Sequence, residues 1–299
     1  MNNLGVTPRY VIITPARNEG QYLQATIDSV VAQSLRPQTW VIVDDGSTDN
    51  TGKLIDAAAR QHSWIKAVHR PDRGFRKQGG GVIEAFYDGY KLVDGEPWDF
   101  LVKLDADLSF ESDYFEKCLG RFAADDQLGI GGGRVYCRIN GAIVEDSPND
   151  PQFHVRGATK IYRRACWLAI GGLFKSTGWD TLDEVKANML NWKTYSFNSL
   201  NLLQLKATGS ADGGWRTWLK NGQANYIAGY HPLFMLSKCI WRMREKPYGL
   251  ASAGLWVGYM SACLQGIPRV DDIDLIRYLR KQQIRCLTFR DSLWTNRQT

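Results

Sequence analysis

The feature that most constrains the fold is an alternation of short apolar runs and helical stretches in the first part of the chain. The apolar runs are Tyr10–Ile13, Trp40–Val43, Ile65–Val68 and Phe100–Val102. Between them, apolar residues recur every three or four positions, which is typical of amphipathic helices. Strands that alternate with helices form a mostly parallel sheet flanked by helices. The sequence therefore predicts an α/β fold, and 299 residues suffice for one large domain with an appendage.

Polar clusters follow each of these predicted strands. They are Pro15–Glu19, Asp44–Asp45, Arg70–Lys77 and Asp105–Asp107. In parallel sheets, ligands bind outside the carboxyl ends of the strands. Carboxylates can accept from a base imide and from ribose hydroxyls, whereas arginine and lysine can pair with phosphates. Each cluster alone fits a solvated loop, but four at successive strand ends indicate one binding crevice.

Asp105 and Asp107 lie one residue apart, on either side of Ala106, directly after an apolar run. Carboxylates near a buried strand are costly unless a cation compensates them, and a divalent metal that carries a diphosphate does so. We therefore predict a nucleotide-diphosphate site with Mg²⁺ or Mn²⁺. The alternative is a polar strand exit with solvated aspartates, because Asp-x-Asp alone is a weak signal.

Charge and cysteine usage narrow the class of protein. The net charge is +6, and no basic run with interleaved aromatics suggests a nucleic-acid groove. This favours an anionic small substrate or an anionic membrane surface over nucleic acid. The six cysteines form no C-x-x-C pair, and the N-terminus has no apolar signal segment, which predicts a cytoplasmic protein.

Three ordered motifs carry a resemblance to a known family. They are Pro15-Ala16-Arg17-Asn18-Glu19, Val43-Asp44-Asp45-Gly46-Ser47-Thr48-Asp49 and Leu104-Asp105-Ala106-Asp107. Their order and separation resemble the nucleotide-sugar half of glycosyltransferase family 2, whose fold is the GT-A type and whose Asp-x-Asp pair is its DXD motif. The resemblance implies a nucleotide-sugar-binding site that contains Pro15, Arg17, Glu19, Asp44, Asp45, Lys77, Asp105 and Ala106. It implies Asp107 as the ligand of Mg²⁺ or Mn²⁺.

A second acidic cluster, Asp180, Asp183 and Glu184, lies near the start of a predicted helix. Carboxylates there are also favoured by the helix dipole, so capping is one interpretation. The resemblance implies a general base for the acceptor hydroxyl, with Glu184 as the first candidate and Asp183 as the second. The glycine pair at 171–172 has two interpretations, a helix C-terminus or a close approach to the donor sugar.

The segment Tyr248–Gly266 is uncharged and carries an amphipathic stripe. Its content of Ala, Ser, Gly and Gln is too high for an inserted helix, so we reject a transmembrane span. With its basic flanks it either lies on an anionic cytoplasmic membrane surface or packs on the catalytic domain.

Together these features predict a GT-A catalytic domain over 1–235, with a nucleotide-sugar half over about 8–125 and an acceptor half over about 126–235. A helical C-terminal region follows over 236–299. The predicted function is an inverting, metal-dependent transfer from a nucleotide-diphosphate sugar, with UDP expected, to a glycan or lipid-linked acceptor in polysaccharide or glycoconjugate biosynthesis. The alternatives are a polyprenol-phosphate hexose synthase and a non-catalytic carbohydrate-binding scaffold.

Overall fold

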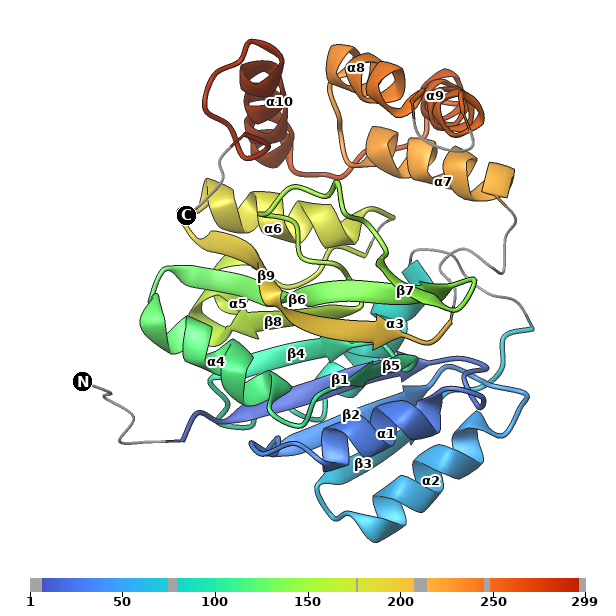
Figure 1. Cartoon of the computed structure of the whole chain (residues 1–299), viewed down its shortest axis with the longest axis vertical. Coiled ribbons are helices and arrows are strands. Elements are labelled where there is room, and N and C mark those ends of the chain that lie inside the picture. The colour runs from blue at the N-terminus through green and yellow to red at the C-terminus, as the bar shows by residue number, and fades with distance from the viewer. Residues whose placement is uncertain (1–6, 75–79, 176, 207–213, 245–247, 296–299) are drawn as a thin grey trace.

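The computed structural model describes residues 7–74, 80–175, 177–206, 214–244 and 248–295. Within these ranges, nine strands form one sheet in the order β3-β2-β1-β4-β8-β6-β9-β5, with β7 beside β6 (Figure 1). The strands are β1 (Tyr10–Ala16), β2 (Thr39–Asp44), β3 (Ile65–His69), β4 (Phe100–Leu104), β5 (Leu108–Phe110), β6 (Leu128–Ile139), β7 (Ala142–Glu145), β8 (Thr159–Arg163) and β9 (Lys193–Gln204). The predicted α/β fold is confirmed.

The helices alternate with the strands in the first half of the chain and gather at its end. They are α1 (Leu23–Val31), α2 (Thr51–Gln61), α3 (Gly80–Tyr90), α4 (Tyr114–Ala124), α5 (Arg164–Ile170), α6 (Trp179–Met189), α7 (Gly214–Ile227), α8 (Pro232–Arg242), α9 (Leu250–Leu264) and α10 (Ile273–Leu287). The predicted helices after β1, β2 and β3 are all present.

The sheet is parallel where the sequence predicted it. β1, β2, β3 and β4 pair in parallel, so their carboxyl ends meet at one edge. β8 then pairs antiparallel with both β4 and β6, whereas β6 pairs in parallel with β9. The second half of the sheet is therefore mixed rather than parallel, and β8 and β9 bring distant residues to the edge where β4 ends.

Both faces of the sheet are covered, because alternate residues of each strand point to opposite sides. Ile12 of β1 packs in the cluster that α1, α2 and α4 cover, and its neighbour Ile13 packs in the cluster that α3, α5 and α6 cover. Even the largest strand side chain, Trp40, is fully buried and donates to Thr14 Oγ1 over 2.9 Å. Every residue of β1, β2 and β4 is buried. These buried strands hold the loops at their ends in fixed places.

A third layer, α7 to α10, lies beyond α6 on the side away from the sheet (Figure 1). One apolar cluster joins this layer to Leu182 and Val185 of α6. The boundary that we predicted between 235 and 236 falls inside α8. Because the packing groups α7 with α8, α9 and α10, we propose that the helical region begins with α7.

Helices α7 and α9 touch through their backbones. A Cβ added to Gly222 of α7 would lie 2.1 Å from the carbonyl oxygen of Leu255, and one added to Gly258 of α9 would lie 2.0 Å from the carbonyl oxygen of Leu219. Such separations exclude any side chain, so glycine at these two positions sets the distance between the helices.

In the part of the chain that the structure describes, every helix is too short or too polar to span a bilayer.

Candidate active site

The predicted metal ligands lie where β4 ends and β5 begins. Asp107 is 6% exposed, and its Oδ2 accepts from Gln204 Nε2 over 3.0 Å. Burial raises the pKa of Asp107, and the negative charge of Asp105 adds to this, so that the pKa rises to about 7. The raised pKa means that the negative charge of Asp107 is poorly stabilised in this environment. A cation beside the carboxylate would stabilise that charge and lower the pKa.

Asp105 is the more exposed member of the pair. Its side chain accepts from Lys103 Nζ, which also donates to the carbonyl of Gly157. Its backbone N–H donates to the carbonyl of Ala158 over 2.8 Å. These contacts fix Asp105 against the start of β8.

Among the described residues, no group of three or more His, Cys, Asp and Glu side chains is arranged to hold a metal. Mg²⁺ beside nucleotides is bound by one or two carboxylates together with substrate phosphates and water. Asp105 and Asp107 have the donor chemistry for a metal that is bound in this way.

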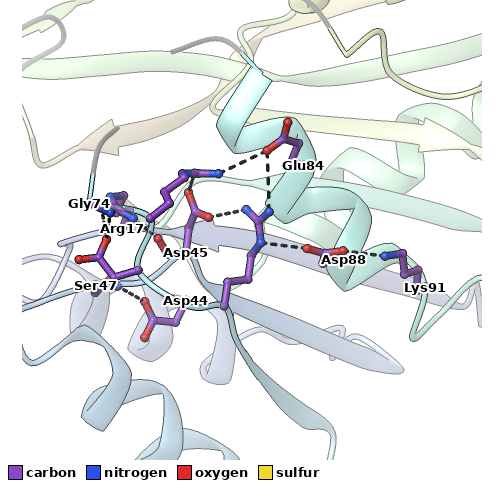
Figure 2. Close-up of polar contacts among 11 residues, drawn as sticks. Arg17, Asp44, Asp45, Ser47, Gly74, Glu84, Asp88 and Lys91 are labelled. Atoms are coloured by element: carbon purple, nitrogen blue, oxygen red, sulfur yellow. Dashed lines mark hydrogen bonds and ion pairs between the residues drawn. The ribbon is translucent and has the colours of Figure 1, made fainter. Parts of the chain in front are cut away.

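The acids predicted to hold the nucleoside follow β1 and β2, and Figure 2 shows two of them, Asp44 and Asp45, where β2 ends. Asp44 accepts from the N–H of Ser47 over 2.8 Å and lies 3.3 Å from His69 Nδ1. Arg17 donates to the carbonyl of Asp45 and to the carboxylate of Asp72. Pro15 and Ala106 are buried, so they shape the backbone of the site rather than offer a side chain. The structure thus brings together the residues of the first three predicted motifs.

Asp45 lies between two arginines that the sequence analysis assigned to phosphate. Both Arg70 and Arg73 donate to its carboxylate (Figure 2). Arg70 Nε also lies 2.9 Å from Asp88 Oδ2, and Arg73 Nη1 lies 3.3 Å from Glu84 Oε2. Because α3 carboxylates hold both guanidinium groups, a phosphate would have to exchange with them. Arg76 and Lys77, the other predicted phosphate ligands, lie outside the described residues.

The end of β9 contributes two polar residues that sequence reasoning missed. Lys206 Nζ lies 2.6 Å from Glu19 Oε1, and Gln204 bonds Asp107 as described above. The sequence did contain a signal for them, because Gln204 and Lys206 are polar residues that directly follow a β-rich run. Its relevance depends on β9 lying beside β5, which the order of elements in the chain does not reveal.

The three acidic residues of α6 lie in two different environments: two are buried in an ion-pair cluster, and the third lines a cavity. Asp183 and Glu184 are fully buried. Asp183 accepts from Tyr162 Oη over 2.6 Å and from Lys160 Nζ over 2.9 Å. Glu184 accepts from the N–H of Val155 over 2.7 Å, and its other contacts are His154 Nδ1 at 2.8 Å and Lys160 Nζ at 2.7 Å.

Lys160 is the centre of this buried cluster and was not predicted. It is fully buried on β8 and neutralises both acids. Burial raises the pKa of Glu184, whereas Lys160 and His154 lower it, and the net shift is upward. Neither acid lies in the first turn of the helix, so the capping interpretation is wrong for both.

Lys160 supplies a stability prediction. Replacing it by methionine removes the one cation that contacts both buried carboxylates, which is expected to lower the free energy of unfolding by about 3–5 kcal/mol in urea titration. The matched control is Lys66→Met, because the Lys66–Glu96 pair is 2.8 Å long but lies at the surface. Its expected cost is about 0–1 kcal/mol. Equal losses in the two variants would show that the buried cluster adds no stability.

Asp180 differs from its two neighbours because it lines a cavity. It shares this cavity with His154, Tyr230 and residues of α7, α8 and α9. Burial raises the pKa of Asp180, but the charges of His154 and Lys160 lower it more, so that the net shift is downward and the group is ionised at neutral pH. Of the three acids, Asp180 is therefore the one that lines a cavity.

Trp179 connects this cavity to the Asp105 side. Lys103 Nζ lies 5.3 Å from the centre of its ring, and Lys160 Nζ lies 5.5 Å from it. A Cβ added to Gly157 would lie 3.5 Å from Cβ of Asp180, and the carbonyl of Gly157 accepts from Lys103. A short chain of contacts therefore links Asp180 to Asp105. Asp180 lies beside Gly157, the carbonyl of Gly157 accepts from Lys103, and Lys103 also donates to Asp105.

The glycine pair at 171–172 ends a helix. Gly171 follows α5 with φ of 75°, and its backbone N–H caps the last turn. Gly172 has φ of 82°, and an added Cβ would lie 2.6 Å from Tyr87 Oη. Tyr87 Oη bonds both the N–H and the carbonyl of Leu173. These contacts support the helix C-terminus over an approach to the donor sugar.

The family is shown by its sequence model. The model of glycosyl transferase family 2 matches residues 11–171, which is more than half of the chain. The chain belongs to glycosyl transferase family 2. The match includes the motifs at the ends of β1, β2 and β4, and it confirms the resemblance and the enzyme class, a glycosyltransferase.

The alignments with curated relatives cover only part of each protein. Hyaluronan synthase of Pasteurella multocida is 27% identical over 157 residues, which cover 51% of this chain and 15% of that protein. Glycosyltransferase GlyG of Streptococcus pneumoniae is 28% identical over 96 residues, which cover 32% of this chain and 29% of that protein. The alignments thus span less than a third of these relatives.

Solved structures share the fold. Mannosyltransferase PcManGT from Pyrobaculum calidifontis, solved with GDP-Man and Mn²⁺, matches with a TM-score of 0.54 and 16% identity over 96% of this chain and 77% of that one. TarS 1-349 of S. aureus with UDP matches with a TM-score of 0.53 and 15% identity over 83% and 69%. At these identities the likeness establishes the GT-A fold.

Proposed function

We propose that this glycosyltransferase is inverting and metal-dependent. It moves a sugar from a nucleotide-diphosphate sugar, with UDP as the expected nucleotide, to a hydroxyl of a glycan or lipid-linked acceptor. We assign it to polysaccharide or glycoconjugate biosynthesis at the cytoplasmic face of the membrane. The observation that carries the proposal is the pair Asp105 and Asp107 at the end of β4, where the buried carboxyl of Asp107 lacks compensating charge.

Two comparisons support the donor and the pathway class. The names of the relatives include a hyaluronan synthase and a poly-beta-1,6-N-acetyl-D-glucosamine synthase, both of which make polysaccharides. The neighbouring structures contain GDP-Man with Mn²⁺, UDP or UDP-GlcNAc. UDP and GDP are therefore the first nucleotides to test.

The chemistry assigned to the chain's own residues is a single displacement. Asp105 and Asp107 would hold the divalent cation, which, when bound, stabilises the negative charge of the leaving diphosphate. Asp180 takes the proton from the acceptor hydroxyl as that oxygen attacks the anomeric carbon from the opposite face. Because no covalent sugar intermediate forms, the configuration at this carbon inverts.

Thermal melting tests the donor half. UDP, GDP and their sugars are each added with and without Mn²⁺, at about 100 times their dissociation constants. One nucleotide is expected to raise the melting temperature by about 5 °C, and only with the metal, because binding to the folded state stabilises it. AMP is the control nucleotide. A shift that is the same with Mn²⁺ and with EDTA would contradict the metal-dependent site.

We also propose that the helical layer contacts an anionic membrane surface. Five large apolar residues of α8 and its C-cap are 43–66% exposed: Leu233, Leu236, Ile240, Trp241 and Met243. Helical spacing places them on one side of α8. Arg244 follows this exposed stripe and would favour an anionic lipid surface.

Pelleting with vesicles tests this contact. Wild-type protein is expected to pellet with vesicles of phosphatidylglycerol more than with vesicles of phosphatidylcholine, and the double change Ile240→Ser with Trp241→Ser is expected to reduce the bound fraction several-fold. Leu168→Ser is the matched control, because Leu168 is 63% exposed but belongs to α5. If no vesicle binds, the membrane proposal fails while the transferase proposal stands.

A further inference from the structure

A polar cavity of about 190 Å³ lies between α6 and the helical layer. Its lining includes His154, Asp180, Tyr230, Lys238 and Arg242. Half of the lining residues come from α7, α8 and α9, and all of them except His154 lie outside the matched family region of 11–171. The cavity is therefore built largely by the part of the chain that follows the family match.

Two cations project from one side of α8 into this cavity. Lys238 and Arg242 are four residues apart, so they lie on the same helix face, opposite the exposed apolar residues. Aromatic rings support both charges, since Lys238 Nζ lies 5.3 Å from the Tyr230 ring and Arg242 Cζ lies 5.4 Å from the Trp218 ring. Among the described residues, no carboxylate forms an ion pair with Lys238.

Lys238 carries a buried charge at this cavity. Burial lowers the pKa of Lys238 to about 8, and the nearby Arg242 lowers it further, whereas Asp150 and Asp180 act in the opposite direction. Among the described lining residues, the one carboxylate is that of Asp180, the proposed base. An anion bound beside Lys238 would compensate its buried charge, and it would leave Asp180 able to accept a proton.

We propose that this cavity is the acceptor subsite and that it selects an acceptor sugar with an anionic group, a phosphate or a carboxylate, which Lys238 and Arg242 bind. The attacking hydroxyl of the same sugar lies at Asp180. The inference rests on the proposed function, because it takes Asp180 as the base. It adds the class of acceptor, which the motifs at the strand ends do not specify.

Calorimetric titration of the full chain tests the subsite without turnover. The probes are glucose 1-phosphate, glucuronate, glucose and inorganic phosphate. One or both of the sugar anions are expected to bind at least about tenfold more tightly than glucose, because a charged hydrogen bond is worth a factor of this size. The stronger of the two distinguishes a phosphorylated acceptor from a uronic acid. Inorganic phosphate is expected to bind more weakly than the sugar phosphate.

Lys238→Gln is expected to weaken binding of the sugar anion about 10- to 100-fold and to leave glucose unchanged. Lys117→Gln is the matched control, because it removes one positive charge from an exposed helix elsewhere in the fold. Equal affinity for glucose and the anions, equal losses in the two variants, or inorganic phosphate binding as tightly as the sugar phosphate would each overturn the proposal. Binding of UDP with Mn²⁺ to the same samples is measured separately, so that a failed donor site is distinguished from a failed acceptor subsite.

Discussion

Asp107→Asn is expected to lower kcat for sugar transfer about 100- to 1000-fold. The change keeps the shape of the side chain and an oxygen that can accept from Gln204, but it removes the charge that would hold the metal. Loss of one group that stabilises developing charge typically has an effect of this size. The rate is measured with saturating donor over a range of Mn²⁺ concentrations, because excess metal is not expected to restore it.

Asp126→Asn is the control for this change, because Asp126 is an exposed aspartate in the loop before β6. It is expected to leave kcat unchanged. The pH dependence gives an independent check. Since the pKa of Asp107 is about 7 without metal, protons compete with the cation as the pH falls below 7. Metal-dependent binding of UDP is thus expected to weaken from pH 8 to pH 6, and near-normal transfer by Asp107→Asn would refute the metal role.

Asp180→Asn is expected to lower kcat about 100- to 10,000-fold, which is the contribution of a positioned general base. Binding of UDP with Mn²⁺ is expected to stay unchanged, because Asp180 lies on the acceptor side of Trp179. The low pKa of Asp180 also has a consequence for the wild-type enzyme. With donor and Mn²⁺ saturating, protonation of the base is expected to limit kcat only below the ordinary pKa range of an aspartate.

Glu184→Gln and Asp183→Asn separate the base from the buried cluster. Both changes remove a partner of Lys160, so they are expected to lower the melting temperature. Asp180→Asn leaves these ion pairs intact and removes only the longer-range attraction of Asp180 to His154 and Lys160, so it is expected to lower the melting temperature less than the other two changes. If Glu184→Gln instead abolishes turnover without a loss of stability while Asp180→Asn stays active, Glu184 is the base, as the sequence analysis first proposed.

The donor half of the site was predictable because its residues follow strands in chain order. Each buried run ends in a polar cluster, and parallel pairing brings the ends of β1, β2 and β4 to one edge. This rule alone was enough to predict that four acids would lie near one another: Asp44, Asp45, Asp105 and Asp107. The family resemblance then supplied the expected chemistry, and the family match confirms the resemblance itself.

The contacts of the second half were not predictable in the same way. Lys160 lies in β8, which pairs antiparallel with β4 on one side and β6 on the other. No local sequence pattern predicts this order of strands in the sheet. Without it, only a capping role or a general base could be predicted for Asp183 and Glu184, and their pairing with Lys160 could not. Their burial depends on β8 placing a lysine under α6, and the cavity at Asp180 depends on helices that follow much later in the chain.

The contact between α7 and α9 has a consequence for how acceptor preference can change in evolution. At Gly222 and Gly258 the two helix backbones are in direct contact, so neither helix can move closer to the other. A larger residue at either position would force the helices apart. These helices provide Asn221, Asn225 and Leu255 to the cavity wall. In a homologue that keeps both glycines, α7 and α9 therefore keep the same spacing, and the part of the cavity wall that they form keeps the same width. Such a homologue can adapt to a new acceptor by exchanging side chains such as Asn225 or Lys238, whereas a homologue that loses a glycine must rebuild the whole wall.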